Sequence, residues 1–160
     1  MAHSSKPNNK MLKYIFALLI LSAVLISPAV SLVSGTSSNA NIRVVVKGIK
    51  PVKGNVGLLI FNSKQGFPSD ERKALKQSII PVTGSTMEYV FEGLVPGKYA
   101  VAIIHDENAN RKLDTNFMGI PREGYGVSNN IVNMFGPPGF DESSFTLKPG
   151  TLTTEINVHY

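Results

Sequence analysis

The sequence predicts an all-β fold, an antiparallel β-sandwich of about seven strands with one short helix and one long ordered loop. Short apolar runs recur along the chain with a period of two, and Gly and Pro separate them. The dipeptides Pro96–Gly97 and Pro149–Gly150 suit type II turns, in which Gly takes a positive φ at the second central position. Short strands joined by such turns are typical of two packed antiparallel sheets.

Five segments carry the strand pattern, at residues 42–47, 55–61, 87–92, 99–104 and 152–159. The second of them is apolar on both faces, which predicts a central strand covered on both sides. The last has a clean alternation of apolar and polar residues, which predicts a strand with one buried face. A helical turn or two is expected at residues 69–76, because Ser69 can cap it and Asp70 and Glu71 suit its positive end.

Residues 115–143 break this pattern, because they are rich in Gly, Asn and Pro and contain no convincing strand. A structureless stretch of this length is usually functional or disordered. Its apolar side chains argue against disorder. They are Phe117, Met118, Ile120, Tyr125, Phe135 and Phe140. We therefore expect an ordered excursion that folds against the sandwich.

The first 35 residues have the order of a secretory signal, and residues 36–160 are expected to form a single β-sandwich domain. Three lysines precede an apolar run from Tyr14 to Ile26, and small residues follow. Cleavage could follow Ala29/Ser31 or Val33/Gly35, and Met11 is an alternative start. The other interpretation is a retained membrane anchor, since 14–33 is about long enough to span a bilayer. An exported protein, periplasmic or extracellular, is the first expectation.

The remaining composition restricts the class of partner. Three of the 16 basic residues lie in the first 35 positions and all 11 acidic residues lie beyond them, so the exported part has a net charge of +2. The sequence contains no basic patch with interleaved aromatics, which is the pattern that indicates nucleic-acid binding. The chain has no Cys, which excludes disulfides, thiol chemistry and a lipid-modified cysteine. Contact with a membrane is expected only through the N-terminal segment, if it is uncleaved.

The stretch 106–114 carries the strongest functional signal. Oxygen-bearing side chains stand at loop positions 1, 3, 5 and 9, a spacing that can wrap around one calcium ion, and the carbonyl of Lys112 falls at position 7. The four side chains are Asp106, Asn108, Asn110 and Asp114. The loop is not an EF-hand, because Arg111 replaces the Gly of position 6 and Phe117 replaces the Glu of position 12. The alternative interpretation is a plain solvated turn.

A further ligand could come from outside this stretch. Glu123 is the best candidate for an additional carboxylate, and Asp141–Glu142 is a weaker one. The competing interpretation for Glu123 is a surface ion pair with Arg122 or Lys112. The predicted metal site therefore comprises Asp106, Asn108, Asn110, Lys112, Asp114 and Glu123, with calcium as the cofactor.

His105 invites a catalytic interpretation, with Ser128 as a possible partner, but catalysis needs a nucleophile or metal within hydrogen-bond reach. The sequence has no nucleophile-elbow motif and no zinc-ligand spacing. We therefore expect His105 to hydrogen-bond a loop carbonyl at the entrance of the ion loop. Tyr99 follows a turn at the start of a strand, so it is either a corner tyrosine bonded to backbone or a plain core aromatic.

Several of these pieces together resemble the family of domain of unknown function 2141, which comprises small exported bacterial proteins. The residues that carry the resemblance, over roughly residues 42–158, are Gly93–Leu94, Pro96–Gly97, Tyr99–Ala100–Val101, His105–Asp106–Glu107–Asn108, Asn110, Leu113–Asp114–Thr115–Asn116, Gly119–Ile120–Pro121, Glu123, Tyr125–Gly126 and Ser128–Asn129–Asn130. The resemblance implies an immunoglobulin- or transthyretin-like sandwich outside the cytoplasm, and it implies no reaction. The chain departs from the family at Ala109 and Arg111, where family loops tend to have Gly.

Three functions remain open at this stage. The first is a non-catalytic exported sandwich whose calcium loop stiffens a long binding loop for an envelope protein or polysaccharide. The second is an envelope hydrolase or isomerase that acts through His105. The third is a purely structural module of the envelope.

Overall fold

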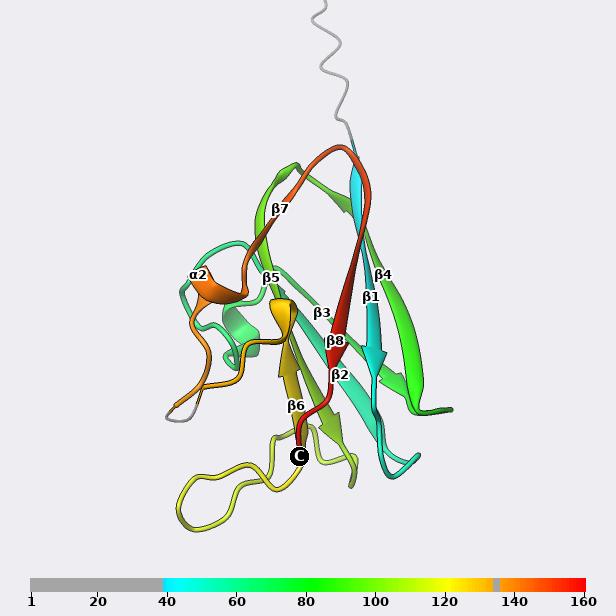
Figure 1. Cartoon of the computed structure of the whole chain (residues 1–160), viewed down its shortest axis with the longest axis vertical. Coiled ribbons are helices and arrows are strands. Elements are labelled where there is room, and N and C mark those ends of the chain that lie inside the picture. The colour runs from blue at the N-terminus through cyan, green and yellow to red at the C-terminus, as the bar shows by residue number, and fades with distance from the viewer. Residues whose placement is uncertain (1–38, 134–135) are drawn as a thin grey trace, which may run out of the picture. The chain divides into compact units, whose positions relative to one another are not determined.

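Two β-sheets pack face to face in the part of the chain that the structure describes, residues 39–133 and 136–160 of a computed structural model (Figure 1). The first sheet has the order β4-β1-β8, and the second has the order β3-β2-β5-β6 with β7 also paired to β5. The strands are β1 (Ala40–Lys47), β2 (Asn55–Phe61), β3 (Lys76–Pro81), β4 (Thr86–Leu94), β5 (Gly97–Asp106), β6 (Gly124–Val127), β7 (Phe145–Leu147) and β8 (Gly150–Asn157). The all-β sandwich is confirmed.

The expectation of purely antiparallel sheets is wrong for one pair of strands. β1 and β8 run parallel, from Ala40 beside Gly150 to Lys47 beside Asn157, whereas β1 and β4 are antiparallel. The chain crosses from β7 in one sheet to β8 in the other, so the direction of β8 is set by that crossing (Figure 1). The alternation within a strand reports which face is buried and carries no information about the direction of its neighbour.

The main core lies between the sheets and is built from alternate residues of the strands. Its fully buried side chains include Ile42 and Val44 of β1, Val56 and Leu58 of β2, and Ile103 of β5. A second core covers the outer face of β2 and β5. Its buried members are Leu59, Phe61, Ala100, Ala102, Val127 and Phe140. The prediction of a central strand at 55–61 that is covered on both sides is therefore confirmed.

The expected helix at residues 69–76 is wrong in extent and in its cap. Only a single 3-10 turn, η1 (Glu71–Lys73), forms there, and Asp70 rather than Ser69 caps it through the Arg72 backbone N–H. Lys76 already belongs to β3, whose pairing with β2 replaces the helical bonds. A short α-helix, α2 (Phe140–Ser143), lies instead in the stretch that was expected to lack regular structure.

That stretch, residues 115–143, also contains β6 and a 3-10 turn, η2 (Ser128–Asn130). The expectation that it holds no strand is therefore wrong. β6 reads Gly-Tyr-Gly-Val, and its two glycines have poor strand propensity. They are required because a Cβ on Gly126 would lie 2.7 Å from Cγ2 of Ile156, and one on Gly124 would meet the side chain of Val158.

The turn between β4 and β5 carries the chain from one sheet to the other. In this turn Gly97 does not have the positive φ expected for a type II turn, and Gly93 takes a φ of 66° instead. In the β7–β8 turn Gly150 does have the expected positive φ. The hydroxyl of Tyr99 donates a 2.7 Å hydrogen bond to the carbonyl of Val95. Tyr99 is thus a corner tyrosine that fixes this crossing, as one of its two predicted roles required.

The described residues contain no helix with the length and apolarity needed to cross a membrane. The predicted signal or anchor segment within residues 1–35 lies outside the described residues.

Candidate functional site

The pairing of β5 with β6 places the candidate site at one end of the second sheet. His105 and Asp106 are the last two residues of β5, and Glu123 directly precedes β6. His105 pairs with Gly124 across the two strands, so the segment between them leaves and returns at neighbouring points. This segment, residues 107–122, is called the β5–β6 loop below, and it extends from one end of the sandwich (Figure 1).

Asp106 organises the first half of the β5–β6 loop. Its carboxylate is 5% exposed, and it accepts hydrogen bonds from the backbone N–H groups of Asn110 at 3.0 Å and Arg111 at 2.7 Å. The chain can turn back on Asp106 only because Ala109 and Arg111 have φ values of 60° and 65°. Gly adopts this conformation freely, whereas residues that carry a side chain adopt it rarely.

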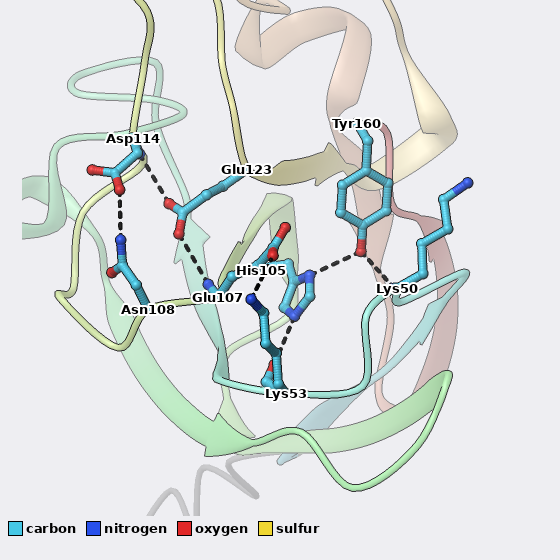
Figure 2. A network of polar contacts seen from close by, with 8 residues as sticks. All are labelled: Lys50, Lys53, His105, Glu107, Asn108, Asp114, Glu123 and Tyr160. Atoms are coloured by element: carbon cyan, nitrogen blue, oxygen red, sulfur yellow. Dashed lines mark hydrogen bonds and ion pairs between the residues drawn. The ribbon is translucent and has the colours of Figure 1, made fainter.

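Glu123 closes the base of the loop. Its side chain is 4% exposed, and its two carboxylate oxygens accept the backbone N–H of Glu107 at 3.0 Å and of Asp114 at 2.9 Å (Figure 2). Neither Lys112 nor Arg122 forms an ion pair with it among the described residues. Glu123 therefore holds the two ends of the loop together by accepting backbone N–H groups, and it does not form the alternative surface ion pair.

Asn108, Asn110 and Asp114 come together as the spacing predicted. The amide nitrogen of Asn108 donates to Oδ2 of Asp114 at 2.6 Å, and that of Asn110 donates to Oδ1 at 3.1 Å. The amide oxygens accept backbone N–H groups, from Asn110 at 3.0 Å and from Lys112 at 2.8 Å. The two amide groups thus place partial positive charge against the Asp114 carboxylate.

These residues fit a weak cation site better than a strong one. Within residues 39–133 and 136–160, no three His, Cys, Asp or Glu side chains are placed to hold one metal ion together. Carboxylate oxygens can accept more than one bond each, so Asp106 keeps free lone pairs beside its two N–H partners. The amides of Asn108 and Asn110 would have to turn their oxygens inward. Glu123 is committed to the loop base.

His105 is fully buried and both of its ring nitrogens are engaged. Nε2 lies 2.9 Å from the carbonyl oxygen of Lys53, and Nδ1 lies 2.8 Å from the hydroxyl of Tyr160 (Figure 2). A carbonyl only accepts, so Nε2 carries the proton and Nδ1 accepts from Tyr160. The expectation that His105 bonds a loop carbonyl is confirmed.

Tyr160 links this histidine to a second loop. Its hydroxyl accepts the backbone N–H of Lys50 at 2.7 Å while it donates to His105. Burial raises the pKa of the Tyr160 hydroxyl, and the negative charge of Glu107 raises it further, whereas the hydrogen bond from Lys50 opposes both. The contact ties residues 50–53 and the last residue of the chain to the end of β5.

The other residues considered for chemistry lie elsewhere. Ser128 is fully buried, and its hydroxyl oxygen accepts the backbone N–H of Val101 at 3.0 Å and donates to the carbonyl of Ser143, so it does not reach His105. Asp141 pairs with Lys98 at 2.8 Å, near the beginning of β5 rather than its end. Lys47 forms an ion pair with Glu155 at 2.7 Å, and Lys53 forms one with Glu107 at 3.3 Å.

The tip of the β5–β6 loop is the feature that the sequence interpretation missed. Phe117 is 97% exposed, Met118 68% and Ile120 53%, so these side chains do not fold against the sandwich as expected. An isolated bridge between Thr115 and Pro121 closes the tip. The residue types gave no signal, because an irregular loop can carry the same apolar residues whether it is buried or exposed.

Comparison with known proteins is consistent with this architecture. Residues 44–155 match the family model described as "Uncharacterized protein conserved in bacteria (DUF2141)". No match was found among curated proteins or among solved structures. The matched residues run from β1 to β8 and include the whole β5–β6 loop. The chain therefore belongs to the DUF2141 family of uncharacterised bacterial proteins.

Proposed function

We propose that this protein is an exported, non-catalytic binding module and that the β5–β6 loop is its binding element. The observation that carries the proposal is the group of exposed apolar side chains at Phe117, Met118 and Ile120. Single apolar residues on a surface are ordinary, whereas a contiguous group marks an interaction site. Here three of them fall within four consecutive positions at the tip of one loop.

The polar framework at the base supports this interpretation. Asp106 and Glu123 are nearly fully buried, and each accepts two backbone N–H groups of the loop. Hydrogen bonds to a carboxylate are the stronger kind, so the loop is held in one shape before any partner arrives. A preorganised loop loses less conformational entropy on binding, which favours affinity.

Calcium would strengthen the same framework. Asp106, Asn108, Asn110, the carbonyl of Lys112 and Asp114 would hold the ion, and Glu123 would keep the two ends of the loop together. The ion would supply fixed positive charge where the two amides now face Asp114. Two carboxylates and two amides make a weakly charged site, and we expect a dissociation constant of about 10⁻⁴–10⁻³ M, as in extracellular calcium modules.

Thermal melting of the protein with calcium and with a chelator tests the ion. At a calcium concentration ten times the dissociation constant, binding adds about 1.4 kcal/mol to the free energy of unfolding. Asp114→Asn should abolish the calcium-induced rise in melting temperature, because it removes one of the two carboxylates while keeping the shape of the side chain. Asp141→Asn, at an exposed carboxylate elsewhere, is the matched control and should leave it intact.

Two outcomes would remove calcium from the proposal. One is an unchanged melting temperature at several millimolar calcium, where a site of the expected affinity is substantially filled. The other is an equal rise in the parent and in Asp114→Asn. The Asp106→Ala change is a poorer test, because it leaves two backbone N–H groups of a buried turn without an acceptor.

Export and the absence of catalysis each have their own test. The basic and apolar order of the first 35 residues supports export, and intact-mass analysis of the protein from cells should give a chain that begins near residue 32 or 36. The engagement of both His105 nitrogens by Lys53 and Tyr160 supports a structural histidine. His105→Gln should therefore lower the melting temperature while leaving binding by the loop tip intact once folded.

A further inference from the structure

We propose that the tip of the β5–β6 loop enters the surface of an anionic lipid bilayer, with Phe117, Met118 and Ile120 among the acyl chains. This inference rests on the proposed function and names its partner. It goes beyond the expectation that only an uncleaved N-terminal segment would contact a membrane. Three features indicate a lipid partner: the backbone of the tip, its side chains and the charges beside it.

The backbone of the tip is prepared for an apolar surrounding. The N–H of Asn116 donates to the carbonyl of Ile120, and the N–H of Gly119 donates to the carbonyl of Asn116, both at 2.9 Å. The side-chain oxygen of Asn116 accepts the N–H of Met118 at 2.9 Å and of Ile120 at 3.0 Å. Pro121 has no N–H. Irregular backbone is tolerated in lipid only where its polar groups are satisfied internally, and the N–H groups of Met118, Gly119 and Ile120 meet that demand.

The side chains of the tip suit lipid better than a protein pocket. No charged residue lies between Thr115 and Pro121, and the most exposed side chain is the 97% exposed Phe117. The β5–β6 loop extends from one end of the sandwich (Figure 1), and its three large apolar side chains are exposed. A convex apolar tip can enter a bilayer without a complementary cavity in its partner.

The flanking charges select the type of lipid. Arg111, Lys112 and Arg122 are exposed, whereas the acidic residues of the same loop are engaged. Asp114 accepts the two asparagine amides, and Glu107 pairs with Lys53. Each basic residue near an anionic bilayer strengthens binding, so the three together favour anionic over neutral headgroups. A calcium ion in the loop would add to the same attraction.

The fluorescence of a tryptophan introduced at the tip reports the polarity around the tip alone, because the chain contains no other Trp. Phe117→Trp is the test variant, and Val95→Trp is the matched control at a 74% exposed apolar position in the β4–β5 turn. Each full-length variant is mixed with vesicles of phosphatidylglycerol and phosphatidylcholine, in calcium and in chelator. The N-terminal segment is the same in both variants, and Leu94 pairs with Ala40 at the start of β1, so recruitment through that segment would not favour position 117 over position 95.

The expected result is a blue shift of the indole emission at position 117, together with quenching by lipids that carry brominated acyl chains. Position 95 should show neither. In the Phe117→Trp background, Ile120→Ser should weaken the vesicle titration about fivefold or more. Arg122→Gln should weaken it about fivefold on anionic vesicles only, and Lys148→Gln, an exposed lysine at the β7–β8 turn, should not.

Two results would overturn the proposal. One is an unchanged emission at position 117 with anionic vesicles in calcium. The other is an equal change at positions 117 and 95. If either occurs while the loop amides remain protected from exchange, the proposed binding loop stands and its partner is a protein. If the loop amides are also unprotected from exchange, the loop is not preformed, and the proposed function fails together with the proposal of a lipid partner.

Discussion

The backbone N–H of Arg111 donates a 2.7 Å hydrogen bond to Oδ2 of Asp106, and Arg111 makes this bond at a φ of 65°. A residue with a side chain is strained in this conformation by about 1–2 kcal/mol. The buried carboxylate of Asp106 therefore holds the chain in a turn that Gly would adopt without strain.

Replacing Arg111 with Gly should stabilise the folded protein and tighten calcium binding for two separate reasons. Relief of strain acts with and without the ion, because it depends only on the positive φ of Arg111. The greater freedom of Gly in the unfolded chain opposes it by up to about 1 kcal/mol. Loss of one positive charge near a dication raises the affinity by about fivefold, which corresponds to about 1 kcal/mol.

Titration calorimetry and melting of Arg111→Gly and Arg111→Asn separate these effects. Asn tolerates a positive φ and also removes the charge, so the two variants should gain the same calcium affinity. Lys112→Gln removes a neighbouring charge without altering the turn and should gain part of it. If calcium binds all of these variants and the parent equally, the positive charge does not face an ion and the plain-turn interpretation leads.

Replacing Glu123 with Gln should loosen the base of the β5–β6 loop. Gln presents one oxygen and one NH₂ group where two backbone N–H groups, of Glu107 and Asp114, need acceptors. A buried donor left without a partner costs about 1–3 kcal/mol. Urea unfolding should show this loss, and Glu142→Gln, at an exposed carboxylate on α2, should show none. An unchanged stability in Glu123→Gln would mean that the loop does not depend on this clamp.

The Tyr160 contact should make stability fall at alkaline pH. Burial raises the pKa of this hydroxyl above its ordinary value of 10.0, so the folded state holds the proton more tightly than the unfolded state. The contribution of this hydroxyl to the free energy of unfolding is therefore fully present below pH 10.0 and is lost as the pH rises through the raised pKa. Urea unfolding of the parent and of Tyr160→Phe across this range measures it. The difference in stability between them should shrink on the alkaline side, and a constant difference would contradict the assignment.

The sequence predicted the parts of the fold that depend on local periodicity. The central strand at 55–61 and its two covered faces follow directly from apolar residues on both faces, with Val56 and Leu58 in the main core and Leu59 in the second core. β6 could not be predicted in this way, because Gly124 and Gly126 are chosen for close packing against β8 and the C-terminus rather than for strand propensity. The parallel pairing of β8 with β1 depends on the path of the chain between sheets, which no local pattern encodes.

The sequence predicted which residues lie together at the candidate site, but it did not predict what each of them contacts. Asn108, Asn110 and Asp114 lie together through hydrogen bonds to one another, Arg111 has the positive φ expected at its loop position, and calcium binding by these residues stays a prediction. The double contact of Glu123 with Glu107 and Asp114 depends on the β5–β6 register, so spacing along the chain could not reveal it. The apolar tip was misassigned because exposure and burial of an irregular loop leave the same residue types in the sequence.

The central claim is that the β5–β6 loop is preformed, and native-state exchange of its backbone amides tests this most directly. In the free protein, the amides of Met118 and Ile120 should exchange at least about tenfold more slowly than in an unstructured peptide, although the tip side chains are exposed. Asn116→Ala removes their shared acceptor and should release both, while Gly119, which bonds the backbone carbonyl of Asn116, should lose less protection. Exchange of Met118 and Ile120 at the rate of an unstructured peptide in the parent protein would contradict the account.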